Sequence, residues 1–222
     1  MRVLLIAFVT CIACKNSTQT NQKTSTDSSS TILEKIFSDQ NTLDNNIWVD
    51  RLNGQTYPLP DSIAGKPVSF YLNNPKVKPI AKALYSGQFR PTDNDSTTEL
   101  LTNVTTNDSI LRPFYRWCLD FTISISDGAL AEYPGKPALK YALEFPKEFL
   151  NYMNKDTSGR RFANWTGIIA YSGLEDYNRN KFEFEKEIVS KMLSKCPSCE
   201  EEEKNQIKKF AKEITASVKL QD

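Results

Sequence analysis

The clearest pattern in the chain is a spacing of apolar residues by three and four, which is one face of an amphipathic helix. It is strongest in residues 109–128, where the stripe consists of Leu111, Phe114, Tyr115, Cys118, Leu119 and Thr122. Two more stripes near the C-terminus are Phe182, Ile188, Val189, Met192, Leu193 and Ile207, Phe210, Ala211, Ile214, Val218. Only the short loop Cys196–Cys199 separates these two segments, which predicts an antiparallel pair of helices.

Pro, Gly and capping residues occur at intervals along the rest of the chain and predict where other helices begin and end. The further helices expected are residues 31–37, 67–73, 79–87, 96–104, 136–155 with a break or kink at Pro146, and 160–173. The predicted fold is therefore all-α: a multi-helix bundle or a short helical array with a C-terminal antiparallel helix hairpin.

Residues 42–60 allow two interpretations. They form either a short helix followed by an extended loop, or two strands about an Asn53-Gly54 turn. We favour the helix and loop, because Pro58 and Pro60 cannot donate to a sheet ladder.

The first thirty residues follow a different pattern. Arg2 precedes an apolar run from Val3 to Ala13, which is far short of the roughly 20 residues that cross a bilayer and has the order of an export signal. Residues 15–30 contain no apolar residue, so they cannot bury enough surface to offset the entropy of ordering them. The sequence thus predicts a signal peptide at 1–13, a flexible tether at 14–30 and a single helical domain at 31–222.

The junction Ile12-Ala13-Cys14 resembles the lipobox of bacterial lipoproteins, in which a small residue precedes a cysteine that becomes lipidated. The resemblance covers only this stretch, and it departs from the family at Cys11, where Leu is usual. It implies lipidation of Cys14, a membrane anchor and a place in the cell envelope, facing the periplasm or the surface. Each buried CH₂ contributes about 0.8 kcal/mol, so several acyl chains anchor stably. An ordinary cleaved signal peptide with a soluble product is the alternative.

The charge and composition of the chain exclude several classes of function. The chain has 28 basic and 27 acidic residues, so nothing drives it as a whole toward nucleic acid, and we expect no nucleic-acid partner. It has no histidine, which excludes Ser–His–Asp, Cys–His and HExxH chemistry and removes the commonest transition-metal ligand. We expect no metal and no cofactor. Carboxylate pairs and Ser–Lys arrangements remain open to an enzyme.

The spacing of Cys196 and Cys199 suits either a redox pair or a structural disulfide. No strand precedes the pair, and a zinc site would find only Cys118 besides, so we favour a disulfide that staples the turn in an oxidising compartment. Cys118 lies on an apolar stripe and is expected to be a buried thiol.

Asp61-Ser62-Ile63, Asp95-Ser96-Thr97 and Asp108-Ser109-Ile110 resemble the sites at which exported proteins of Bacteroidota are O-glycosylated. The same residue types also begin helices, where their side chains accept hydrogen bonds from the first amides. We favour capping, and modification of Ser62, Ser96 or Ser109 remains the weaker hypothesis.

The segment Arg112–Phe121 combines two guanidiniums, a carboxylate and large aromatics, and Arg112, Arg116 and Asp120 share one helix face. A ligand-facing strip would use Arg forks for a carboxylate and Trp117 for stacking. Its candidate residues are Arg112, Arg116, Trp117, Asp120 and Asp127. The favoured alternative is an ion-pair ladder on a solvated face, since such ladders are common and weak.

Taken together, these patterns predict a lipid-anchored envelope protein with a helical interaction domain for a protein partner of unknown identity. One alternative is a carboxylate-dependent hydrolase of envelope glycans that uses Asp120, Asp127 or Glu132. Others are an immunity or inhibitor protein for an exported toxin, and a pocket between helices for a small apolar molecule.

Overall fold

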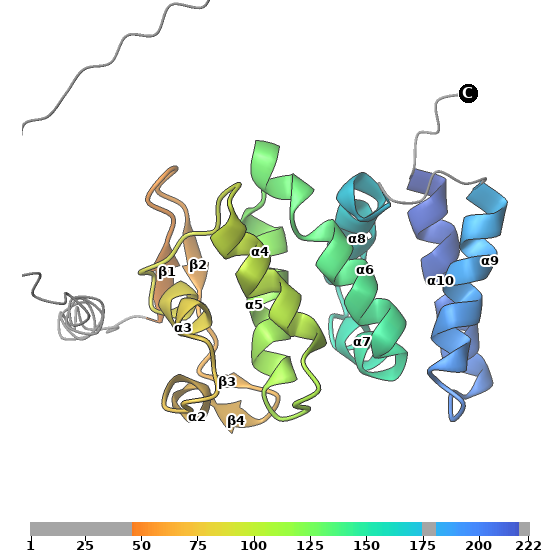
Figure 1. Cartoon of the computed structure of the whole chain (residues 1–222), viewed down its shortest axis with the longest axis horizontal. Helices are drawn as coiled ribbons and strands as arrows, with labels where there is room; N and C mark the ends of the chain where they lie inside the picture. The colour runs from red at the N-terminus through yellow and green to blue at the C-terminus, as the bar shows by residue number, and fades with distance from the viewer. Residues whose placement is uncertain (1–45, 175–180, 218–222) are drawn as a thin grey trace, which may run out of the picture. The chain divides into compact units, whose positions relative to one another are not determined.

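The computed structural model describes residues 46–174 and 181–217, which lie in one compact unit. The described residues are mostly helical, as predicted, with nine α-helices and two small antiparallel sheets (Figure 1). The predicted signal peptide, Cys14, the tether and the helix over 31–37 lie outside the described residues. Within the described residues, every helix is too short or too polar to cross a membrane.

The favoured helix within residues 42–60 is wrong, and the alternative of two strands is what forms. Strand β1 (Ile47–Val49) pairs antiparallel with β2 (Thr56–Pro58), and Gly54 adopts a positive φ in the turn between them. The Leu59 amide donates to the Asn46 carbonyl and the Asp50 amide to the Gln55 carbonyl. In an antiparallel ladder, hydrogen-bonded residue pairs alternate with pairs that are not hydrogen-bonded. The Ile47–Pro58 pair follows the bonded Asn46–Leu59 pair and is therefore not hydrogen-bonded. The missing amide of Pro58 thus removes no hydrogen bond from the sheet.

The hairpin is fixed to the rest of the domain by Trp48 and Asp50, which are both buried. The indole Nε1 of Trp48 donates to the Leu84 carbonyl at 3.0 Å, and its ring meets the ring of Phe121 edge-on. The Asp50 carboxylate accepts two hydrogen bonds from Arg90, and these bonds hold the pKa of Asp50 below its usual value. Asp50 is thus a charged, fully paired anchor in the interior.

Short elements follow the hairpin, and a proline lies at the start of two of the helices among them. They are β3 (Ser62–Ile63), β4 (Lys66–Pro67), α2 (Val68–Leu72), α3 (Pro79–Tyr85), α4 (Asp95–Thr102) and the 3₁₀ turn η1 (Asn103–Thr105). Pro67 precedes α2 and Pro79 is the first residue of α3, as expected. The predicted cap Ser96 is wrong: the Asn94 side chain accepts the Thr97 amide, and Ser96 is exposed in the first turn.

The remaining elements are α5 (Arg112–Ile125), η2 (Gly128–Glu132), α6 (Gly135–Glu144), α7 (Pro146–Asn154), α8 (Arg160–Ile168), the π-helical turn η3 (Ile169–Gly173), α9 (Lys181–Ser194) and α10 (Glu201–Ser217). Helix α5 packs between the earlier elements α3 and α4 and the later helix α8, and α9 and α10 pack in turn on α6, α7 and α8 (Figure 1). The apolar stripe of α5 is buried, and the helix predicted over 136–155 breaks at Phe145, before Pro146. Pro cannot supply an amide to continue α6.

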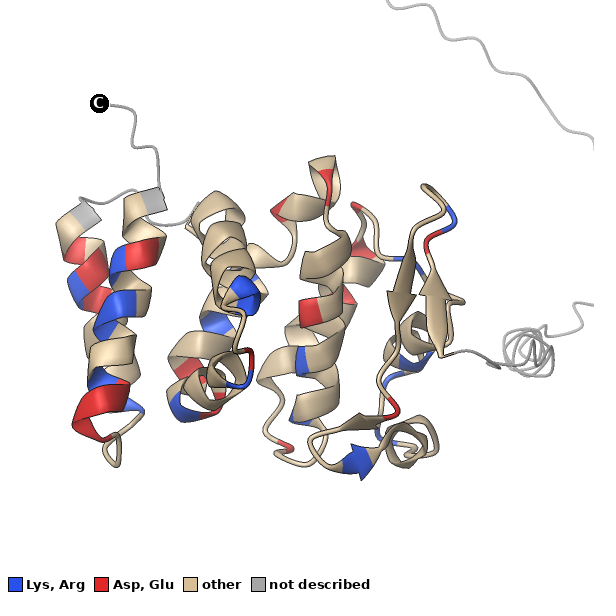
Figure 2. Ribbon diagram, turned by 180° about the vertical axis from the view of Figure 1, so that it is seen from behind, with Lys and Arg blue, Asp and Glu red and all other residues tan. Residues whose placement is uncertain are grey.

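Helices α9 and α10 lie side by side and carry acidic and basic residues interspersed on their surface (Figure 2). Some of these residues form ion pairs within one helix, such as Glu187 with Lys191. A short turn joins the two helices, and it contains a disulfide between Cys196 and Cys199, whose Cα atoms are 5.3 Å apart.

Gly135 allows α6 to pack directly on the π-helical turn η3. A Cβ atom on Gly135 would meet the Ser172 hydroxyl and would lie 2.5 Å from the Gly173 amide nitrogen and 2.7 Å from the Ile168 carbonyl. Two of these atoms belong to the backbone and cannot rotate away. A Cβ atom on Gly167, by contrast, would meet nothing within 4 Å.

These two glycines therefore predict opposite results for the same substitution. Gly135→Ala is expected to lower the free energy of unfolding by about 1–3 kcal/mol, because α6 must move away from η3. Gly167→Ala is expected to leave it unchanged or raise it by up to about 1 kcal/mol, through the helix propensity of alanine. Urea unfolding followed by circular dichroism measures both. Equal effects of the two substitutions would contradict the close packing of α6 on η3.

Candidate functional site

Helices α5 and α8 line a groove that is open to solvent. One section, of about 330 Å³, is lined by Trp117 and Asp120 from α5 and by Arg160 and Arg161 from α8, with β2 at its side. The other section, of about 570 Å³, is lined by Asp127, Gly167 and Tyr171 among others. Ser124 and Asn164 line both sections, so the two sections adjoin, and together they are here called the α5–α8 groove.

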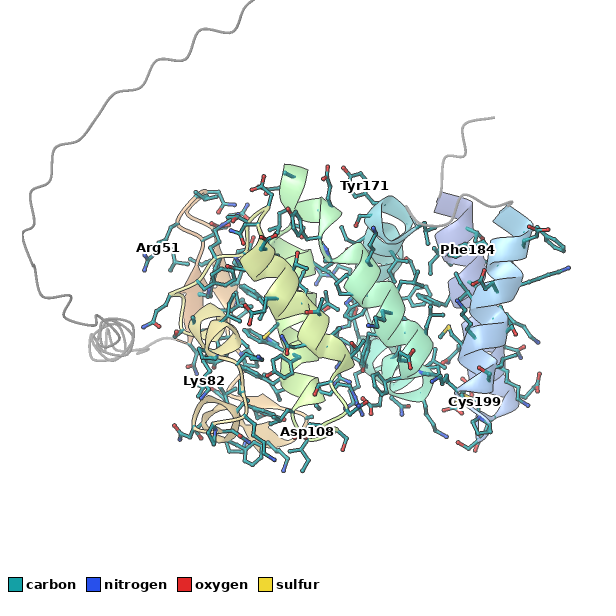
Figure 3. The ribbon with its side chains drawn as sticks, viewed as in Figure 1. Arg51, Lys82, Asp108, Tyr171, Phe184 and Cys199 are labelled. Atoms are coloured by element: carbon teal, nitrogen blue, oxygen red, sulfur yellow. A yellow bond between two sulfur atoms is a disulfide. The ribbon has the colours of Figure 1, made fainter. Side chains whose placement is uncertain are left out.

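The two helices run in the same direction along the groove. Residues 117–124 of α5 accompany residues 160–164 of α8 in the first section, and residues that follow both ranges line the second. Figure 3 agrees: Asp108, just before α5, lies at the lower end of the view and Tyr171, just after α8, at the upper end. The groove therefore has an Arg160 end and a Tyr171 end.

Arg112 lies inside the protein and not on the solvated face that the favoured interpretation requires. The residue is 5% exposed, and its guanidinium donates two hydrogen bonds to Glu148 at 2.9 and 2.7 Å and lies over the ring of Phe145. Glu148 belongs to α7, so the ion pair joins two helices and is not an i,i+4 ladder. A second helix covers this face of α5, which the spacing within α5 does not reveal.

Arg116 is also buried, at 8% exposed, and it has no carboxylate partner among the described residues. It donates to the Tyr141 hydroxyl at 3.0 Å and lies 4.1 Å from the centre of the Tyr152 ring, while its Nε makes no hydrogen bond. Arg161 lies 4.2 Å from the same ring. For Arg116, attraction between the guanidinium and the aromatic ring thus takes the place of an ion pair.

Asp120 connects this interior cluster to the groove. Its carboxylate accepts the Tyr152 hydroxyl at 2.7 Å and the Trp165 indole Nε1 at 2.6 Å, and lies 3.5 Å from the Arg161 Nε. Burial, and next the charge of Asp120, raise the pKa of Tyr152 well above its ordinary value, so this hydroxyl stays protonated and donates.

The five predicted ligand-facing residues therefore separate into two groups. Trp117, Asp120 and Asp127 line the groove, whereas Arg112 and Arg116 lie away from it in the interior. The Trp117 ring stacks on the rings of Phe114 and Phe121 and also contacts Tyr85, so its stacking capacity serves the core. Asp127 is exposed and its side chain makes no hydrogen bond or ion pair within residues 46–174 and 181–217.

Sequence reasoning missed the residues that α8 contributes. Arg160, Asn164, Gly167 and Tyr171 all line the groove and all are exposed. Their spacing of four, three and four places them on one face of the helix, away from the buried Trp165 and Ile169. That spacing was the available signal, but an exposed polar face is the ordinary appearance of any surface helix.

Asp156 fixes the start of α8 and hence the position of the two arginines that follow. Its carboxylate accepts the Ser158 hydroxyl, the Ser158 amide and the Arg161 amide. These bonds, the one from the Ser158 hydroxyl first, lower the pKa of Asp156 to about 2. Asp156 therefore acts as an ionised cap at a helix N-terminus.

The other predicted positions lie apart from the groove. Cys196 and Cys199 are buried in their disulfide, and Cys118 is a buried free thiol whose pKa is raised by burial. No described group of three or more Cys, Asp or Glu residues is arranged to hold a metal ion. Ser62, Ser96 and Ser109 are exposed, and Asp108, before Ser109, accepts the Ile110 and Leu111 amides as a cap does. For Ser62 and Ser96, no such cap by the preceding Asp is seen; Ser62 lies in β3 and Asn94 caps α4.

Comparisons of the chain with protein-family models, curated proteins and solved structures give no significant match.

If the Asp120 carboxylate is a structural hydrogen-bond acceptor, replacing it with the amide of asparagine should destabilise the fold. Asp120→Asn is expected to lower the free energy of unfolding by about 2–3 kcal/mol, because Tyr152 and Trp165 donate to different oxygens of Asp120, one of which becomes an NH₂ group that cannot accept, and because the charge that faces Arg161 is lost. The matched control, Asp127→Asn, is expected to change it by less than about 0.5 kcal/mol. Urea unfolding measures both, and a neutral Asp120→Asn would contradict the network.

Proposed function

We propose that the protein is a lipid-anchored component of the bacterial cell envelope whose helical domain binds a protein partner in the α5–α8 groove. One observation supports the proposal that a partner binds in the groove. Arg160, Asn164 and Asp127 line the groove, are exposed, and their side chains make no hydrogen bond or ion pair to the rest of the described chain. Such groups, held on α8 and just after the end of α5, are available to a partner.

We further propose that the domain is a short helical array that ends in an antiparallel hairpin of α9 and α10. The support is the short turn between the two helices and their contact along one another. The hairpin lies away from the groove, since no residue of α9 or α10 lines it. Its disulfide suits an oxidising compartment, in agreement with export.

The contacts of the groove carboxylates favour binding over hydrolysis of glycans. Each of Asp120 and Asp156 is surrounded by donors of the protein's own chain. A glycosidase needs two carboxyl groups that face the substrate, one of which must give and take a proton. Asp127 alone among the carboxylates that line the groove has no such donors, and Glu132 does not line it. The open, polar lining also argues against a small apolar ligand.

The anchor is tested by Cys14→Ser. The unchanged protein is expected to incorporate labelled palmitate and to sediment with membranes, because the acyl chains on Cys14 enter the bilayer. The Cys14→Ser variant is expected to lose the label completely. Cys11→Ser serves as the matched control and should retain it. Equal labelling of all three proteins, or labelling of none, would contradict the anchor.

The groove is tested by photo-crosslinking in intact cells. A photoreactive phenylalanine analogue in place of the exposed Tyr171 is expected to yield a discrete crosslinked protein, because Tyr171 stands at one end of the groove. The same analogue in place of Ser190, exposed on α9, should not yield this product. Gly167→Phe, which fills the groove, should weaken the Tyr171 crosslink at least fivefold. A crosslink that is unaffected by Gly167→Phe would place the binding surface elsewhere.

A further inference from the structure

We propose that the occupant of the α5–α8 groove is an extended peptide segment of the partner, four to five residues long, with a carboxylate near Arg160 and a cation near Asp127. This inference rests on the proposed function and specifies the chemistry of the partner. Four properties of the groove support it: its length, its floor, the amide at its centre and the charges at its ends.

The length of the groove follows from the helix that forms one wall. Arg160 and Ile168 both line it and are eight residues apart on α8, which corresponds to about 12 Å at 1.5 Å per residue. Tyr171 extends the wall somewhat further. An extended chain advances about 3.3 Å per residue, so four to five residues span this distance.

The floor of the groove admits a polypeptide backbone. It contains the small residues Ser124, Ala163 and Gly167, all of which are exposed. The space above Gly167 is open, since a Cβ atom there would meet nothing within 4 Å. A peptide can therefore approach the α8 backbone closely without displacing a side chain.

Asn164 lies where the two sections of the groove meet, and it is exposed. Its primary amide offers two donors and one acceptor on one planar group. An extended peptide offers the complementary amide and carbonyl at each residue. Asn164 is thus suited to hold a main-chain peptide group, whatever the side chains of the occupant.

The two ends of the groove carry opposite unpaired charges. At one end, Arg160 is exposed and its guanidinium makes no ion pair with any described carboxylate. The neighbouring charges there are engaged: Arg161 faces Asp120, and Asp156 accepts the Arg161 amide. At the other end stands the exposed carboxylate of Asp127. A peptide with the opposite order of charges binds in one direction only, and like charges at either end are rejected.

A glycan fits the groove less well than a peptide. Sugar rings pack on exposed aromatic faces, but Trp117 stacks on Phe114 and Phe121, and Tyr57 contacts Trp48 and Phe121. Tyr171, at 62% exposed, is the one aromatic side chain lining the groove that is mostly exposed. Glycan binding is therefore an outcome that the experiment must be able to detect.

The test selects random heptapeptides on the detergent-solubilised full chain and measures their affinity by fluorescence polarisation. Enriched peptides are expected to share an acidic and a basic residue three to five positions apart and to bind with micromolar dissociation constants. Gly167→Phe is expected to weaken them at least tenfold, because the new ring occupies the space above residue 167. Ser190→Phe, an added ring on exposed α9, should leave the affinity unchanged.

Charge reversal tests the two ends separately from the floor and without filling the groove. Arg160→Glu is expected to weaken the binding of the selected peptides at least tenfold. The Arg160→Glu variant should regain that affinity for peptides in which lysine replaces the acidic residue. Asp127→Lys should likewise weaken the selected peptides and regain affinity for peptides in which glutamate replaces the basic residue. Because both residues are exposed, neither change should disturb the fold, which the thermal unfolding midpoint verifies.

Three results would overturn the inference: no enriched peptide that Gly167→Phe weakens, selected peptides that Arg160→Glu leaves unaffected, or soluble envelope glycans that bind and are lost in Gly167→Phe while peptides are not. If one of these results is obtained but the crosslink from position 171 to a protein still forms and is weakened by Gly167→Phe, the proposed function stands and only the proposed peptide chemistry is refuted. If neither crosslink nor peptide depends on Gly167, both proposals fall.

Discussion

The carboxylate of Asp120 is the interaction on which the rest of the site depends. It accepts hydrogen bonds from Tyr152 of α7 and Trp165 of α8 and faces Arg161 at the start of α8. Three helices thus meet at one acceptor. Trp165 is completely buried, so its indole N–H has no access to water, and an unpaired buried donor costs about 1–3 kcal/mol. Asp120 therefore ties α8 to α5, the two helices that line the groove.

The cluster behind the groove carries more positive than negative charge, and aromatic rings make this tolerable. Arg112 is paired with Glu148, but Arg116 is buried with a tyrosine hydroxyl and a ring face as its partners. Desolvated contacts between a guanidinium and an aromatic face contribute about 2 kcal/mol, which offsets part of the cost of burying the charge. Because these partners are rigid rings on α6 and α7, the wall behind α5 is fixed in position.

The sequence predicts the helices well because proline, glycine and apolar spacing are local signals, as at Pro79, Pro146 and the stripe of α5. It fails where the deciding contact is distant. Pro58 fits a strand only because its pair with Ile47 falls between hydrogen-bonded pairs, and Arg112 is buried only because Glu148, 36 residues away, covers it. The groove is likewise formed by segments about 40 residues apart, so Trp117, Asp120 and Asp127 are found from sequence while the residues of α8 are not.

The residues that shape the groove and the residues that a partner would touch are largely different sets, with Asp120 and Arg161 belonging to both. Shape depends on buried and half-buried groups, namely the Asp120 network and the contact of Gly135 with η3. The surface consists of exposed side chains such as Arg160, Asn164 and Asp127, which support no other element. Exchanges of buried groups of the first set cost stability, whereas exchanges at exposed positions usually change it by less than about 0.5 kcal/mol. The charges at the two ends of the groove can therefore vary to suit a partner while the helices that present them stay in place.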